Sequence, residues 1–185
     1  MAVPPPAPLS AKQELRRRLR AARASAASRL VPVPPAFRDR LCPGMVVACY
    51  HPVGSEADPA RLVAAAQQAG CTLALPHVVD RATPLRFLAW SGEPLAPGPF
   101  GLLQPHSDAP EVAPAIILTP LVGFDRAGHR LGQGAGHYDR AFAAHPTAWR
   151  VGVALSVQEV QRLPSDPWDV PLHAIATDLE WITPS

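Results

Sequence analysis

The sequence is poor in cysteine and has no long apolar run, and each shortage excludes a class of protein. Its three cysteines, Cys42, Cys49 and Cys71, show no CxxC spacing, which argues against a disulfide framework and against a zinc knuckle. Cys49 and Cys71 fall within apolar runs, where free cysteines are usually small core residues. No apolar run approaches the roughly 20 residues that a membrane-spanning helix needs. Membrane-embedded and disulfide-stapled classes are therefore disfavoured.

The first ten residues lack a basic region followed by an apolar block, so they do not resemble a secretory signal. We therefore expect a soluble, cytoplasmic protein with no membrane partner. The formal net charge is only +2, which gives no indication of a nucleic-acid partner.

Lysine is almost absent, because Lys12 is the only one and every other basic residue is arginine. Most of the positive excess lies on one early segment, at Arg16, Arg17, Arg18, Arg20 and Arg23. Such a run either contacts phosphates or forms a solvated helix face, and the second interpretation is the commoner one.

The pattern of apolar residues predicts one α/β domain. Residues 1–9 are rich in proline and alanine, and we expect them to be disordered. Residues 10–185 then form a single domain. Ser10 and Gln13 have the spacing of a helix capping box. Short apolar runs predict buried strands at Met45–Tyr50, Cys71–Leu75, Ala115–Thr119 and Arg150–Ala154.

The first two of these strands flank a helix, in which Asp58 and Pro59 mark the start and Gly70 the end. A helix between two strands is typical of a βαβ unit and a parallel sheet. Further strands are expected at Arg86–Trp90, Ala174–Thr177 and Glu180–Ile182, and helices at His137–Ala144 and after a Ser156–Glu159 capping box. Residues 91–114, heavy in proline and glycine, predict a long surface excursion.

A glycine-rich loop runs from Arg130 to Arg140, with the sequence RLGQGAGHYDR. Alternating glycines allow positive φ and bring successive N–H groups into one concave surface. The helix expected after them adds free N–H groups and its positive dipole end. Arg130 and Arg140 bracket the loop and are suited to forked hydrogen bonds with phosphate. The loop therefore predicts a polyphosphate site, and its alternative is a tight turn without a ligand.

Two better-known loops do not fit this segment. A Walker A loop ends in Gly-Lys-Ser/Thr, which is absent, and the dinucleotide fingerprint needs glycine where His137 stands. Asp139 has two interpretations of equal weight on chemistry alone. It is either a Mg²⁺ ligand, since Mg²⁺ in nucleotide sites uses one or two carboxylates, or a carboxylate that interacts with the helix dipole.

The segment from Pro120 to Arg140, PLVGFDRAGHRLGQGAGHYDR, resembles the signature of the 5-formyltetrahydrofolate cyclo-ligase family, which reads approximately P-x-x-x-F-D-x-x-G-x-R-L-G-x-G-x-G-[YF]-Y-D. Three further segments follow the family's order: Lys12–Arg16, Tyr50–Glu56 and Trp168–His173. The resemblance extends from Ser10 to Thr183. It implies an open, mostly parallel, Rossmann-like three-layer sheet with helices on both faces.

The resemblance also implies an activity, namely conversion of 5-formyltetrahydrofolate and MgATP to 5,10-methenyltetrahydrofolate, ADP and phosphate by a monomer. The catalytic residues would be Lys12 and Arg130. The ATP site would comprise Lys12, Arg16, Arg130, Gly132, Gln133, Gly134, Ala135, Gly136, His137 and Tyr138. His51, Glu56 and Tyr138 would contact the folate, and Asp139 and Asp169 would hold Mg²⁺.

The sequence departs from the family pattern at three positions. His137 stands where the family has an aromatic residue, Ala135 where some members have lysine, and Trp168 where His or Asn is common. Two other functions remain open on the loop alone. One is a kinase-like or isomerase-like enzyme for another phosphorylated small molecule, and the other is a catalytically silent folate- or nucleotide-binding protein.

Overall fold

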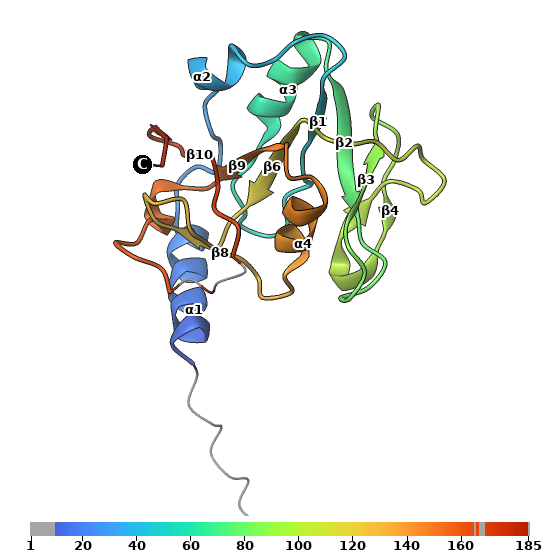
Figure 1. Cartoon of the computed structure of the whole chain (residues 1–185). Helices are drawn as coiled ribbons and strands as arrows, with labels where there is room; N and C mark the ends of the chain where they lie inside the picture. Colours follow the sequence, from blue (N-terminus) through green and yellow to red (C-terminus); the bar gives the residue numbers. More distant parts are fainter. Residues whose placement is uncertain (1–9, 165, 167–168, 185) are drawn as a thin grey trace, which may run out of the picture.

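The computed structural model describes residues 10–164, 166 and 169–184, and its centre is a seven-stranded mixed sheet (Figure 1). The strand order is β11-β10-β9-β6-β1-β2-β3. The strands are β1 (Val46–Ala48), β2 (Thr72–His77), β3 (Arg86–Ala89), β6 (Ile116–Pro120), β9 (Trp149–Val153), β10 (Ala174–Ala176) and β11 (Trp181–Ile182). In this spatial order, each pair of adjacent strands between β10 and β2 is parallel. The two edge strands, β3 and β11, are antiparallel to their neighbours.

Four α-helices and two small hairpins surround this sheet. The helices are α1 (Ala11–Ala24), α2 (Pro35–Arg38), α3 (Ala60–Gln68) and α4 (His137–Ala144), with short 3-10 helices η1 (Pro99–Gly101) and η2 (Ser156–Gln158). The hairpins pair β4 (Ala96–Pro97) with β5 (Leu103–Gln104) and β7 (Gly123–Phe124) with β8 (Arg130–Leu131). Within the described ranges, no helix combines the length and the apolarity that crossing a bilayer requires.

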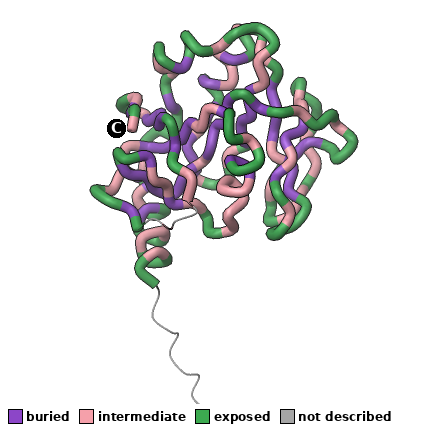
Figure 2. Tube along the Cα trace, viewed as in Figure 1, coloured by how far each residue is buried: buried purple, intermediate pink, exposed green. Residues whose placement is uncertain are grey.

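The central strands are mostly apolar, and helices cover both faces of the sheet. Successive side chains of a strand point to opposite faces. Leu118 of β6 accordingly packs in one cluster with Leu62 of α3, whereas Ile117 packs in a second cluster with Phe142 of α4. Burial on both faces explains continuous apolar runs in place of alternation, and Figure 2 shows the buried strands at the centre of the molecule. The expected three-layer α/β fold is confirmed.

The connections diverge between β1 and β6. From β1 the chain passes through α3 to β2, while from β6 it passes through α4 to β9 on the opposite side. The carboxyl ends of β1 and β6 therefore lie side by side at a topological switch point. In open α/β sheets, ligands bind in the crevice outside such a point.

Helix α1 lies outside the sheet and packs on the β7–β8 hairpin. Leu19 of α1 forms a small buried cluster with Val122 and Leu131. A side chain at Gly123 would place its Cβ 2.4 Å from Leu19 Cδ1, so any larger residue here would force the Leu19 side chain to shift. The capping box predicted at the start of α1 is present, because Ser10 Oγ accepts the Gln13 N–H and Gln13 Oε1 accepts the Ser10 N–H.

Most predicted elements are present, with local corrections. Asp58 does bond to the start of α3, since its Oδ1 accepts the Ala60 N–H at 2.9 Å. The capping box predicted at Ser156 and Glu159 is wrong, because Gln158 Oε1 accepts the Leu155 N–H and Ser156 bonds to Asp178 instead. The excursion over residues 91–114 contains the β4–β5 hairpin and η1. The disorder predicted for residues 1–9 lies outside the described residues.

Candidate active site

The β7–β8 hairpin carries the chain from the end of β6 to the glycine loop, and the buried carboxylate of Asp125 holds its turn. Asp125 Oδ1 accepts the N–H groups of Ala127 and His129 at 3.1 Å each, and Oδ2 accepts the Leu163 N–H at 2.9 Å. Its side chain is 3% exposed. A carboxylate this saturated with backbone donors is structural. The Asp of the Phe-Asp pair in the signature therefore shapes the hairpin that presents the loop.

Within the Arg130–Arg140 segment, Arg130 belongs to β8 and residues from His137 onward to α4. The glycine loop proper is therefore residues 132–136, which connect β8 to α4. Gly134 and Gly136 have φ of +102° and +67°, the left-handed region that favours glycine. Gly136 is also the N-cap of α4, so the loop leads directly to the free N–H groups of that helix. The glycines at 134 and 136 therefore use the positive φ that the alternating pattern allows.

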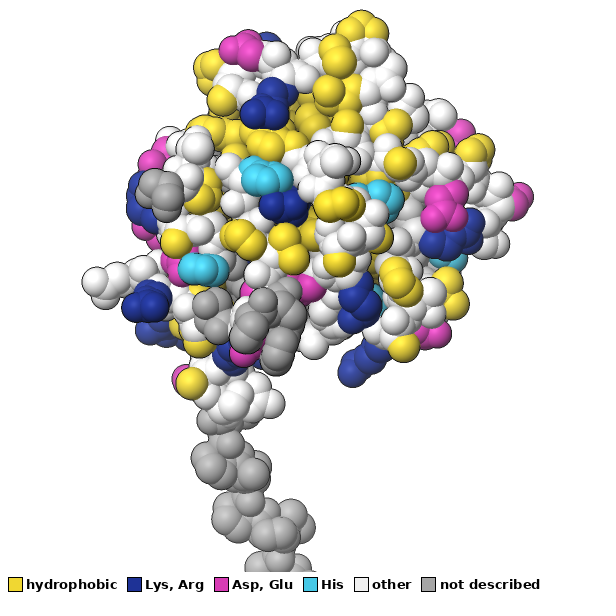
Figure 3. Space-filling model, viewed as in Figure 1, with side chains coloured by type: hydrophobic (Ala, Val, Ile, Leu, Met, Phe, Trp, Pro, Cys, Tyr) yellow, Lys and Arg dark blue, Asp and Glu magenta, His cyan; other side chains and the backbone are white. Residues whose placement is uncertain are grey.

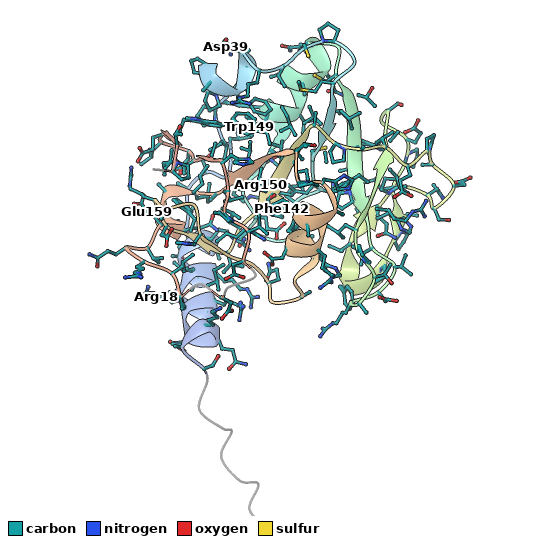
Figure 4. All side chains as sticks on the ribbon, in the orientation of Figure 1. Arg18, Asp39, Phe142, Trp149, Arg150 and Glu159 are labelled. Atoms are coloured by element: carbon teal, nitrogen blue, oxygen red, sulfur yellow. The ribbon has the colours of Figure 1, made fainter. Side chains whose placement is uncertain are left out.

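Arg130 is held rigidly beneath the loop. Its guanidinium donates to Asp139 Oδ1 and to the Val170 carbonyl, and lies 4.5 Å from the Phe142 ring centroid. Its side chain is 6% exposed. Burial lowers the pKa of Arg130, and the nearby carboxylates of Asp139 and Asp169 partly offset this effect. Arg150, beside Phe142 in Figure 4, brings a second positive charge to the same ring at 5.8 Å.

One face of α1 lies along the loop and presents basic side chains at intervals of four residues. Arg16 Nε donates to the Gly132 carbonyl at 2.9 Å, and Arg20 donates to Gln133 Oε1. Lys12 pairs with Asp166 at 2.5 Å. Figure 3 shows Lys and Arg side chains gathered where α1 meets the body of the molecule. The groove between helix and loop has a volume of about 480 Å³ and is lined by Gln13, Arg16, Arg17, Arg20 and Gln133.

Glu56 lies on the other side of the loop, in the turn that follows β1. This glutamate is 8% exposed, and its Oε2 accepts the Val53 N–H at 3.0 Å. Its Oε1 lies 3.5 Å from Gln133 Nε2. The amide of Gln133 therefore connects Glu56 to the basic face of α1.

Two tyrosines surround Glu56. Burial, and then the negative charge of Glu56, raise the pKa values of Tyr50 and Tyr138. Tyr50 donates to the Ala57 carbonyl at 2.5 Å, and the Tyr138 ring lies 6.1 Å from that of Phe142. Both phenols stay protonated at neutral pH, so Glu56 is the negatively charged group among these three side chains.

The predicted metal ligands lie near Arg130. Asp139 Oδ1 accepts a hydrogen bond from the Arg130 guanidinium, and Asp169 Oδ2 accepts the Asp166 N–H at 2.8 Å. In the described part of the chain, no group of three or more His, Cys, Asp or Glu side chains forms a metal cage. Mg²⁺ in nucleotide sites needs only one or two carboxylates, with waters and phosphate oxygens completing the shell. The donor set therefore fits a Mg²⁺ ion that arrives with a nucleotide.

The remaining predicted residues are more dispersed. His51 is exposed at the start of the 51–56 turn. His137 begins α4 and contacts Arg140, whose Nη2 lies 3.2 Å from His137 Nδ1. Arg140 also donates to the Arg81 carbonyl at 2.7 Å, so it is directed toward the β2–β3 connection. Trp168 lies outside the described residues.

Sequence reasoning missed two members of the site. Arg20 contacts the loop, and Arg23, predicted with its neighbours on a solvated face, is only 5% exposed. Their spacing contained the signal, because positions 12, 16, 20 and 23 follow one another by three or four residues and so share one helix face. Arg17 and Arg18 are exposed, as predicted.

The model of the 5-formyltetrahydrofolate cyclo-ligase family matches residues 8–178 of the chain. Among named relatives, the 5-formyltetrahydrofolate cyclo-ligase of Mycolicibacterium smegmatis is 32% identical over 146 residues, covering 72% of this chain and 74% of the relative. That of Haemophilus influenzae is 40% identical over 88 residues, 44% of this chain. The latter match spans 47% of the Haemophilus protein, about half its length.

Solved structures agree with these matches. The 5,10-methenyltetrahydrofolate synthetase of Aquifex aeolicus superimposes with a TM-score of 0.64 at 31% identity, covering 95% of this chain and 84% of the other. That of Mycoplasma pneumoniae superimposes with a TM-score of 0.65 at 22% identity, covering 91% and 99%. The second likeness supports the fold alone.

Proposed function

The chain belongs to the 5-formyltetrahydrofolate cyclo-ligase family, and we propose on this basis that it converts 5-formyltetrahydrofolate and ATP to 5,10-methenyltetrahydrofolate, ADP and phosphate. One observation of the structure supports the proposal independently of family membership. The glycine loop separates a basic, open groove from a buried carboxylate, and Gln133 contacts both sides. A polyphosphate fits the groove and the donor-rich edge of a pterin fits the carboxylate. The loop thus brings two such ligands together.

The reaction needs an activated oxygen, because a formamide oxygen is a poor leaving group. Transfer of the γ-phosphoryl group of ATP to the formyl oxygen releases ADP and gives an imidate phosphate. N10 then attacks the former formyl carbon, the C–O bond to phosphate breaks, and N10 loses its proton. Phosphate departs and the ring closes as the methenyl cation. The protein's task is positioning and charge neutralisation.

Each side of the loop supplies one part of this task. Lys12, Arg16 and Arg130 provide positive charge to the phosphates, while the loop from Gly132 to Tyr138 fixes their direction with backbone N–H groups. Lys12 must leave Asp166 to do so, which is feasible because both partners are partly exposed, at 31% and 42%. An exposed ion pair of this kind contributes only about 0–1 kcal/mol.

The folate side relies on Glu56, whose carboxylate accepts hydrogen bonds from the amino group and ring N–H of a pterin. His51 and Tyr138 complete this side. Mg²⁺, when bound with ATP, offsets phosphate charge, and Asp139 and Asp169 are the residues that would hold it. No protein nucleophile is required.

One assay tests the proposal. Purified protein is mixed with 5-formyltetrahydrofolate and MgATP, and methenyl-folate is followed by its near-ultraviolet absorbance while ADP is measured in parallel. We expect equal amounts of methenyl-folate and ADP. Absence of product with ATP present would refute the activity, and product without ATP hydrolysis would refute the mechanism. Binding of both ligands without turnover would instead identify a silent binding protein.

A further inference from the structure

Arg23 is a buried arginine in the last turn of α1 that no part of the proposed chemistry uses. Its side chain reaches from α1 to two other segments. Nε donates to Ser55 Oγ at 3.2 Å, and Nη1 donates to the Leu121 carbonyl at 3.0 Å. Ser55 follows β1 and Leu121 follows β6. Arg23 therefore bridges the two strand ends that form the topological switch point.

The burial of this guanidinium calls for a compensating charge, because an isolated charge in the interior is costly. Within the described residues, no carboxylate forms an ion pair with Arg23, and its two hydrogen-bond acceptors are neutral. The carboxylate that acts on it is that of Glu56, which raises the pKa of Arg23 against the larger lowering by burial and the lowering by Arg20. Glu56, adjacent to Ser55, thus has its positive counterpart in Arg23.

Arg23 also contacts the segment that carries Glu56. The Glu56 carboxylate accepts the Val53 N–H and lies 3.5 Å from Gln133. The turn over residues 51–56 is held by Arg23 at Ser55 Oγ and by Arg29 at the Gly54 carbonyl. Without Arg23, this turn loses its bond to α1 and its indirect link to β6, and Glu56 loses a neighbouring positive charge.

We propose that Arg23 is a positioning residue for folate recognition, which fixes the Ser55–Glu56 segment so that the Glu56 carboxylate faces the pterin edge in one orientation. The inference rests on the proposed function, since it takes Glu56 as the pterin acceptor. Arg23 itself does not touch the substrate. It differs from Lys12, Arg16 and Arg20, which face the phosphates from the same helix.

The test is a double-mutant cycle on kinetics. The variants are Arg23→Met, Glu56→Gln and the double substitution, with KM measured separately for 5-formyltetrahydrofolate and for ATP. We expect Arg23→Met to raise the folate KM by about 10- to 100-fold, the ratio that corresponds to loss of a charge-assisted hydrogen bond, and to leave the ATP KM within about twofold. Because Arg23 acts through Glu56, the double variant should be no worse than Glu56→Gln alone.

Arg18→Met is the matched control. Arg18 is exposed on the same helix (Figure 4), and its substitution should change neither KM. Thermal unfolding of every variant distinguishes folding defects from kinetic ones. If Arg23→Met does not fold, Arg23→Lys takes its place, since it keeps the charge but cannot reach both acceptors. It should raise the folate KM by a smaller factor, again without changing the ATP KM.

Three results would overturn the inference: an unchanged folate KM, equal increases in both KM values, or additive effects of the two substitutions. Failure of the proposed function is recognised separately, because the wild-type protein would then form no methenyl-folate. In that event the same cycle is measured on the dissociation constant of 5-formyltetrahydrofolate by calorimetry. Non-additive losses of affinity would still support the positioning role, and absence of binding by the wild type would refute it.

Discussion

The two sides of the glycine loop differ in their access to solvent. On the side proposed for the nucleotide, Arg16 and Arg20 line an open groove where water and salt reach the charges. On the side proposed for the folate, Glu56 and Arg23 are buried near Tyr50. Screening weakens interactions between exposed charges, whereas buried charges interact strongly and are costly to leave unpaired.

The contrast suggests that the two sides bind their proposed ligands differently. In the open groove, several arginines would each contribute part of the binding energy of a highly charged nucleotide, so no single contact is essential. In the proposed function, the buried Glu56 carboxylate would recognise a neutral heterocycle from one fixed position. Arg130 is a buried charge, like Glu56, although its proposed ligand is the nucleotide. The effect of a substitution should therefore follow burial of the charge more closely than its distance from the loop.

The largest effect is expected at Arg130. Arg130→Met removes the charge beneath the loop and leaves Asp139 and the Val170 carbonyl without a donor. We expect kcat to fall by about 10²- to 10³-fold, as when one preorganised transition-state donor is lost, together with a lower melting temperature. Arg126→Met, in the same hairpin but exposed, is the control and should retain its activity. A kcat for Arg130→Met within tenfold of wild type would contradict the importance given to burial.

A somewhat smaller effect is expected at Asp139, which is a proposed Mg²⁺ ligand and, in the structure, also accepts a hydrogen bond from Arg130; two variants separate these roles. Asp139→Ala should raise the Mg²⁺ concentration needed for half-maximal activity by about 10- to 100-fold, with little change in folate binding measured by calorimetry. Asp139→Asn keeps an acceptor for Arg130 but loses the charge. If Asp139 acts on Mg²⁺, the Asn variant should show the same Mg²⁺ defect. If it only positions Arg130, the Asn variant should approach wild type.

The sequence was informative wherever one physical requirement dominated. β1, β2, β6 and β9 were predictable because both faces of each strand are buried, which demands continuous apolar residues. Local hydrogen bonds made the start of α1 equally clear. Ser156 misled because Asp178 competes with Glu159: Asp178 Oδ1 accepts the Ser156 N–H that Glu159 would accept in a capping box, and Ser156 Oγ donates to Asp178 Oδ2. That competition depends on a residue 22 positions away, which no local pattern encodes.

For the site, the signature identified the loop but not its supports. The buried role of Asp125 depends on the Leu163 N–H, 38 residues along the chain, and the burial of Arg23 depends on Leu121, 98 residues along. Both are tertiary contacts. The roles assigned to all of the predicted site residues, from Lys12 to Asp169, remain predictions.

A moderate effect is expected at Arg16. Its Nε donates to the Gly132 carbonyl, so Arg16→Met removes both a positive charge from the groove and a contact that holds the loop. We expect the ATP KM to rise about tenfold, the factor for losing one charged hydrogen bond at its weaker limit. The folate KM should change little. Raising the ionic strength should reduce the difference between variant and wild type, because the groove is open to salt. A salt-independent difference would indicate a structural effect.

The smallest effect is expected at Arg17, which lines the same groove as Arg16 but pairs with Glu14 on the solvent side of α1. Both members of this pair are well exposed, at 70% and 50%, and an exposed pair adds little to stability or binding. Arg17→Met should therefore keep the ATP KM within about twofold of wild type at physiological salt. A tenfold rise, equal to that of Arg16→Met, would mean that the groove responds to its total charge. The contact of Arg16 with the loop would then not be what distinguishes these two neighbours.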